Sequence, residues 1–126
     1  KWAGKNPSNY LVEVEDEEIL HRANPDFQLL KKSTNQGVIL TSLASSMEYD
    51  FVSRFFAPGR GVNEDPVTGA AHCCLGPYWS EKLGKKNLVA YQASARGGVV
   101  WVRFTGERVY LGGQAITILR GELLTD

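Results

Sequence analysis

The chain has 126 residues, of which 43% are hydrophobic, and this is enough for one domain with a buried core. Its 14 Lys and Arg residues balance its 14 Asp and Glu residues, and the pI is near 6.9. This balance gives no electrostatic reason to expect a nucleic acid or an anionic membrane surface as a partner.

The two cysteines and the hydropathy pattern bear on cellular location. Cys73 and Cys74 are adjacent, so their side chains diverge on a helix and form a poor disulfide. A reducing, cytoplasmic setting is the natural inference. No apolar run approaches the ~18 residues of a membrane span, and no signal-peptide pattern opens the chain. The chain begins at Lys1 and its only methionine is Met47, so we expect a fragment or a processed piece.

The first quarter of the chain predicts short elements. Residues 1–9 contain breakers and are expected to be a linker or a segment that crosses between domains. Alternating apolar residues predict a strand over 10–15. Asp16 is expected to cap a short helix, and Asn24 followed by Pro25 is expected to begin another.

Two strands lead to the middle of the chain. Residues 38–42 predict one strand, and residues 47–56 predict a longer one with apolar side chains on both faces. A two-sided strand is expected at the centre of a sheet. Arg54, in the middle of this strand, is most simply exposed or ion-paired, with an interdomain anion contact as the alternative.

A helix is predicted over residues 69–83. Apolar residues cover much of its circumference, which suits a helix enclosed by a sheet. Pro77 is expected to bend it, and Gly84 is expected to end it. Strands outnumber helices, so the predicted class is α+β. Three strands are predicted after the helix, over residues 88–94, 99–105 and 109–119.

The loop before this helix carries the most informative chemistry. The helix opens on Gly69 and Ala70, where no bulky side chain shields the backbone N–H groups or the positive end of the helix dipole. An anionic ligand group can therefore approach closely. Asp65 adds a hydrogen-bond acceptor, which suits an amino-carboxylate ligand that also brings an amine or a proton. The simpler alternative is that Asp65 and Thr68 only cap the helix.

Other motifs at this place are weak. His72, Cys73 and Cys74 form the only cluster of soft metal ligands, but three consecutive helix residues point in different directions, so no metal site is expected. The same geometry argues against a cysteine nucleophile with His72 as its base. His72 either hydrogen-bonds a ligand or the Asp65 loop, or it is a core histidine. Dinucleotide and P-loop fingerprints match poorly.

The stretch FVSRFFAPGRGVNEDPVTGAAHCCLGPYW, residues 51–79, resembles the signature of the phenazine-biosynthesis PhzF-like family. The segments YQASARGGVVWVRF and VYLGGQAITILRGEL resemble that family's closing strands, so the similarity runs from about Tyr10 to Leu123. Members resemble diaminopimelate epimerase in fold, with two similar domains, each a curved sheet around a central helix, and a cleft between them. Only the second domain matches, so residues 10–126 are expected to form a single C-terminal domain whose N-terminal partner domain is absent.

The resemblance implies an isomerase that moves a proton within a small amino or hydroxy carboxylic acid, such as a dihydro-hydroxyanthranilate, without metal or organic cofactor. The family's aspartate falls on Asp65, and its amide cradle falls on Gly69 and Ala70, with His72 as a further substrate-binding candidate. The family commonly has Ser in place of Ala70, so one hydroxyl is lost. Relatives are often homodimers, so a homodimer is expected.

The family's general acid/base is a Glu of the first domain, and no acid of this chain matches it. Glu64 is nearest by position but has no motif support, so the chain alone is expected to be inactive. Racemisation by a cysteine pair is less favoured, because Asp65 and Pro66 occupy the corresponding loop. A second hypothesis stays open: a catalytically incomplete, stand-alone domain that binds small carboxylates or another protein.

Overall fold

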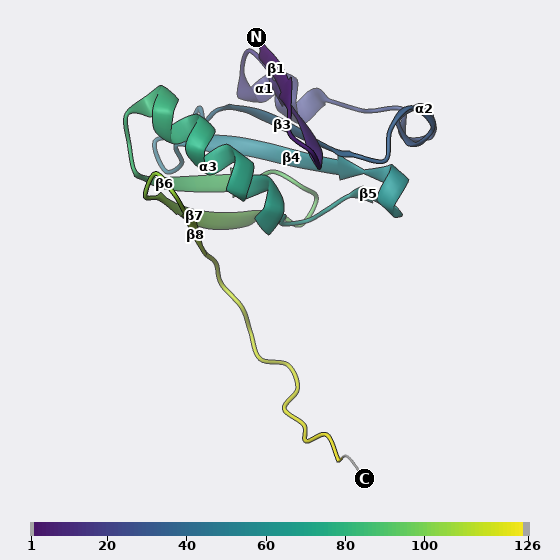
Figure 1. Cartoon of the computed structure of the whole chain (residues 1–126), viewed down its shortest axis with the longest axis vertical. Coiled ribbons are helices and arrows are strands. Elements are labelled where there is room, and N and C mark those ends of the chain that lie inside the picture. The colour runs from purple at the N-terminus through teal and green to yellow at the C-terminus, as the bar shows by residue number, and fades with distance from the viewer. Residues whose placement is uncertain (1, 125–126) are drawn as a thin grey trace.

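The computed structural model describes residues 2–124, which form one mixed β-sheet with helices on both faces (Figure 1). The strands lie in the order β1-β2-β3-β4-β6-β7-β8, with β5 paired to β4. The pairs β2–β3 and β4–β6 are parallel and the others are antiparallel. The strands are β1 (Trp2–Lys5), β2 (Asn9–Glu13), β3 (Gly37–Leu43), β4 (Phe51–Ala57), β5 (Val62–Glu64), β6 (Asn87–Gln92), β7 (Gly98–Phe104) and β8 (Val109–Gly112). The helices are α1 (Glu17–Arg22), α2 (Phe27–Ser33), the 3₁₀ turn η1 (Pro58–Arg60) and α3 (Gly69–Leu83).

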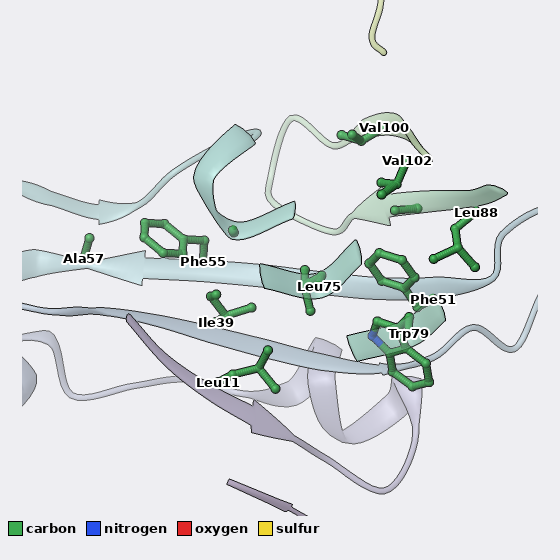
Figure 2. Close-up of a cluster of buried hydrophobic side chains, with 12 residues drawn as sticks. Leu11, Ile39, Phe51, Phe55, Ala57, Leu75, Trp79, Leu88, Val100 and Val102 are labelled. Atoms are coloured by element: carbon green, nitrogen blue, oxygen red, sulfur yellow. The ribbon is translucent and has the colours of Figure 1, made fainter. Parts of the chain in front are cut away.

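Helix α3 lies on one face of the sheet and forms the main core with it (Figures 1 and 2). Trp79 of α3 stacks on Phe51 of β4, with ring centroids 5.6 Å apart. Its indole N–H donates to Oγ1 of Thr41 at 3.0 Å, which satisfies the one polar atom of this buried ring. The core residues of this cluster are Leu11, Ile39, Phe51, Phe55, Ala57, Ala71, Leu75, Trp79, Leu88, Ala90, Val100 and Val102.

Both edges of the sheet reach α3. At one edge, the rings of Trp2 in β1 and Tyr78 in α3 lie 5.3 Å apart. At the other edge, Val102 and Val109 lie so close to Gly76 that a Cβ there would come within 2.9 Å of Val102 Cγ1. The helix therefore carries a glycine where it crosses β7 and β8, because any side chain would hold the layers apart. The sheet is thus wrapped around a central helix, as predicted.

The opposite face of the sheet is covered by α1 and α2. A second cluster, formed by Leu20, Leu40, Val52 and Phe56, lies between these helices and strands β3 and β4. Strand β4 therefore has buried side chains on both faces, as predicted for a central strand. Its one partly exposed residue, Arg54, pairs with Glu64 through two hydrogen bonds of 2.8 and 2.9 Å and donates to three carbonyl groups, of Leu20, His21 and Ala23. The simpler prediction for Arg54, an ion pair, is confirmed.

The α+β class, the helix at residues 69–83 and its end at Gly84, with φ of 64°, are as predicted. The cap of α2 is wrong: Asp26, not Asn24, accepts the N–H of Leu29 at 2.9 Å. Residues 47–50, predicted as the start of β4, are not part of that strand. The short strand β5 was not predicted. These are errors at element ends, where local patterns are weakest.

The two ends of the sheet differ most from expectation. Residues 2–5, expected in a linker or crossing segment, form the edge strand β1 against β2. The last predicted strand, residues 109–119, stops at Gly112, and residues 113–124 are irregular and exposed. An extended segment becomes a strand only where a neighbour accepts its hydrogen bonds, and no strand pairs with residues 113–124 in the described chain. Lys1 and residues 125–126, at the ends of the predicted ranges, lie outside the described residues. Within residues 2–124, no helix is long and apolar enough to cross a membrane.

Replacing Trp79 tests the central position of α3. Trp79→Ala removes a ring that is 2% exposed, its stack on Phe51 and its hydrogen bond to Thr41, so the free energy of unfolding should fall by about 3–5 kcal/mol. Trp101 is 43% exposed, so Trp101→Ala, as matched control, should cost less than about 1 kcal/mol. Urea unfolding of both variants measures the difference. Equal losses would show that α3 does not centre the core.

Candidate functional site

The start of α3 is open to solvent. Gly69 and Ala70 are exposed, and a Cβ added at Gly69 would meet nothing closer than Leu111 Cδ1 at 3.7 Å. Thr68 is the N-cap residue, but its side chain makes no capping hydrogen bond. Among residues 2–124, the backbone N–H groups of Gly69 and Ala70 have no hydrogen-bond partner. The helix therefore presents free donors and the positive end of its dipole, as the sequence predicted.

Asp65 lies beside this helix start without capping it. Its Oδ2 accepts the hydroxyl of Thr68 at 2.5 Å, and no hydrogen bond to Oδ1 occurs in the described part of the chain. The side chain is partly exposed. The alternative in which Asp65 and Thr68 only cap the helix does not match this geometry, because the two side chains bond each other and leave the N–H groups of the helix free.

The loop that carries Asp65 is tied to two strands. The backbone N–H of Asp65 donates to Phe55 O of β4 at 3.0 Å. Gln92, at the end of β6, donates through Nε2 to Asp65 O at 2.7 Å and accepts the N–H of Thr68 through Oε1 at 2.8 Å. Ser94 donates to Pro66 O at 2.9 Å. These contacts fix the loop against the sheet, so that Asp65 is held by rigid elements.

Gln92 and Ser94 were not predicted as residues of this site. Gln92 is fully buried in an otherwise apolar strand face, which it shares with Leu88 and Ala90. A long polar residue in such a pattern was the available signal, because a buried amide needs several partners. The sequence does not say where those partners lie, since they are 24 to 27 residues away.

His72 lies beneath the helix start and has no exposed surface. Its Nδ1 is 2.8 Å from Thr68 O, which can only accept, so Nδ1 carries the proton. Its Nε2 is buried and has no partner among the described residues. Burial lowers the pKa of His72 below its ordinary value of 6.5, and the hydrogen bond to Thr68 opposes this only in part. His72 is therefore a buried histidine that supports the Thr68 turn, and it has no exposed surface.

A groove of about 630 Å³ runs from the helix start along β7, β8 and the segment that follows. Arg96 is the only charged residue that lines it in the part of the chain described. Asp65 and Ala70 are not part of its lining. Its residues are Val67, Gly69, Arg96, Gly97, Gly98, Val99, Val100, Leu111, Gly112, Gly113, Gln114, Ala115, Ile116 and Ile118.

Other polar candidates have structural partners. Both oxygens of Glu64 bond Arg54, so this acid, considered for its position beside Asp65, is engaged in an ion pair. Cys73 is exposed and Cys74 accepts a hydrogen bond from Asn6. No group of three or more His, Cys, Asp or Glu side chains within residues 2–124 is arranged to hold a metal ion.

The buried His72 predicts a pH dependence of stability. Because its folded-state pKa lies below 6.5, the unfolded chain binds more protons below that pH. Above pH 6.5, the titration of His72 should not change the free energy of unfolding. As the pH drops from 6.5 toward the folded-state pKa, the free energy of unfolding should fall. Urea unfolding between pH 8 and pH 5 measures this. His72→Gln should flatten the decline. An unchanged decline in His72→Gln would contradict the assignment.

The chain is similar to known proteins over most of its length. The family model for phenazine biosynthesis-like proteins, PhzC-PhzF, matches residues 1–121. An uncharacterized isomerase of Halalkalibacterium halodurans is 54% identical over 123 residues, which cover 98% of this chain and 46% of that protein. A second uncharacterized isomerase, from Pseudomonas aeruginosa, is 50% identical over 113 residues and is covered over 42% of its length. The chain thus spans less than half of the length of these relatives.

Solved structures show the same fold. The crystal structure of a PhzF-family protein from Enterococcus faecalis superposes with a TM-score of 0.85 and 40% identity, over 98% of this chain and 46% of that one. A PhzC/PhzF protein from Clostridium difficile gives a TM-score of 0.80 and 38% identity, over 93% and 45% of the two chains. The α+β, diaminopimelate epimerase-like fold is thereby confirmed, and the chain belongs to the phenazine biosynthesis-like PhzF family.

Proposed function

We propose that this chain supplies one wall of the active site of an isomerase that moves a proton within a small amino or hydroxy carboxylic acid. One observation carries the proposal: the unpartnered N–H groups of Gly69 and Ala70 lie beside Asp65, which keeps one carboxylate oxygen free. Membership of the PhzF family and the naming of two relatives as isomerases support the reaction class.

The helix start is suited to the carboxylate of such a substrate. Two N–H donors and the helix dipole together favour an anion, and the dipole alone contributes about 0.3–1 kcal/mol at an exposed site. Arg96, in the adjoining groove, adds positive charge on the same side. The free Oδ1 of Asp65 can then accept a hydrogen bond from the amine or hydroxyl of the same molecule. An acid without such a donor would place its charge beside that of Asp65, so the pair of groups selects for amino or hydroxy acids.

The proton itself needs a group on the facing wall. Moving a proton between two atoms of a substrate requires an acid/base within hydrogen-bond reach, in a cleft that excludes water. Glu64 is bonded to Arg54, and His72 has no exposed surface, so neither is placed to serve. We propose that a residue of an N-terminal domain, corresponding to the part of the relatives that this chain does not cover, is the acid/base.

A second candidate function is favoured by the exposed end of the chain. Five aliphatic side chains there are 87–94% exposed: Ile116, Ile118, Leu119, Leu123 and Leu124. Such a segment is typical of a protein contact. In this candidate, the domain binds small carboxylates or another protein and has no turnover. The two functions differ in whether a longer form of the protein converts a dihydro-hydroxyanthranilate.

Replacing Asp65 tests the first function. In the full-length protein, Asp65→Asn should reduce turnover of a dihydro-hydroxyanthranilate by about 100-fold or more. The amide accepts a hydrogen bond from the amine or hydroxyl of the substrate less well than the carboxylate does. Asp26→Asn is the matched control, since Asn keeps the capping of α2 far from the site. Chromatographic assay of the product measures both. Full activity of Asp65→Asn would remove Asp65 from the mechanism, and binding without turnover by the wild type would favour the second function.

Restoring a hydroxyl at position 70 should improve binding. Ala70→Ser adds a donor and acceptor beside the free N–H groups, and one further hydrogen bond should tighten the binding of anthranilate by up to about tenfold. Ala3→Ser, an exposed position in β1, is the matched control. Calorimetric titration of each variant measures the dissociation constant. Unchanged binding by Ala70→Ser, as in the control, would show that this surface does not face the ligand.

A further inference from the structure

A chain of hydrogen bonds runs from the core of the sheet to Asp65. It begins at Gln92, which is fully buried, passes through the hydroxyl of Thr68, and ends at Asp65 Oδ2. The distances are 3.1 Å from Gln92 Nε2 to Thr68 Oγ1 and 2.5 Å from Thr68 Oγ1 to Asp65 Oδ2. Of these three residues, only Asp65 reaches the surface.

The orientation of the Gln92 amide is determined by its partners. Oε1 faces the N–H of Thr68, which can only donate, and Nε2 faces Asp65 O, which can only accept. A flipped amide would place donor against donor and acceptor against acceptor. The second hydrogen of Nε2 therefore points at Thr68 Oγ1 and nowhere else.

This fixed amide sets the direction of the Thr68 hydroxyl. Because Oγ1 accepts from Gln92, its own hydrogen is directed to the remaining acceptor, Asp65 Oδ2. Thr68 makes no side-chain capping bond to its helix, and Oδ1 of Asp65 stays available. The same glutamine occupies the N–H of Thr68, so the first free donors of the helix are those of Gly69 and Ala70.

We infer that Gln92 is a positioning residue of this site: through the Thr68 hydroxyl, it holds Asp65 beside the open helix start and leaves both free for a ligand. The inference rests on the proposed function for its ligand, a small amino or hydroxy carboxylic acid. Gln92 itself touches no ligand, because it has no exposed surface.

The test uses variants of the 126-residue chain, with anthranilate as the probe. Gln92→Met keeps the length of the side chain and removes all three hydrogen bonds. Thr68→Val removes only the hydroxyl and carries the same expectation if Gln92→Met fails to fold. Thr41→Val is the matched control, because the Thr41 hydroxyl is also buried and also both donates and accepts, but it lies between Val52 and Trp79.

Titration followed by the amide NMR signals of Gly69 and Ala70 should show about tenfold weaker binding for Gln92→Met and for Thr68→Val, and an unchanged affinity for Thr41→Val. The double variant Gln92→Met/Thr68→Val should be no weaker than the single variants, since both act through one hydroxyl. Thr68→Ser should retain wild-type affinity. Independent, additive losses, or a loss in Thr41→Val as large as in Thr68→Val, would overturn the inference.

Crystal structures separate this inference from the proposed function. In Gln92→Met the Thr68 hydroxyl should leave Asp65, and Oδ2 should move out of hydrogen-bond reach, whereas Thr41→Val should retain the contact. An undisturbed contact in Gln92→Met would overturn the inference whatever the ligand does. If the wild type fails to bind anthranilate while the contact breaks as expected, the proposed function is contradicted and the positioning role of Gln92 stands.

Discussion

The enclosure of α3 by the sheet is the constraint on which the other features depend. Trp79 and Leu75 anchor the helix on β4, Trp2 reaches it from one edge, and Gly76 allows β7 and β8 to approach it at the other edge. A helix held on so many sides cannot rotate or slide, so its first residues emerge at one defined place. The free N–H groups of Gly69 and Ala70 are therefore presented in a fixed direction, which is what a binding site requires.

The polar contacts at this helix start satisfy buried polar atoms but do not cap the helix. Buried polar atoms must find partners, and Gln92, Thr68 and Asp65 meet that need among themselves while leaving the helix N–H groups without a partner. A capping side chain would have satisfied one N–H group of this helix start and stabilised the helix by about 1 kcal/mol. The molecule forgoes this stabilisation at the place where the proposed ligand binds.

The groove at the edge of the domain bears on the proposed facing domain. Two of the exposed aliphatic side chains after Gly112, Ile116 and Ile118, line the groove that also includes Gly69 at the helix start. The relatives are more than twice as long as the part this chain matches. A facing domain that covered this end would bury the apolar segment and close the site in one step, which is consistent with a proposed acid/base on the opposite wall.

Local patterns in the sequence determined much of this molecule. The apolar circumference of residues 69–83 marked the enclosed helix, and the two-sided pattern of β4 marked the central strand. The small residues Gly69 and Ala70 marked the open helix start. All three features could be predicted, because each depends on neighbours within a few residues of the chain. Tertiary structure alone decided that Gln92 supports Asp65, that His72 is buried beneath the site, and that residues 113–124 lack a strand partner. These depend on segments far apart in the chain, and a buried amide, a buried imidazole or an unpaired strand is recognised only when its partners, or their absence, are seen in space.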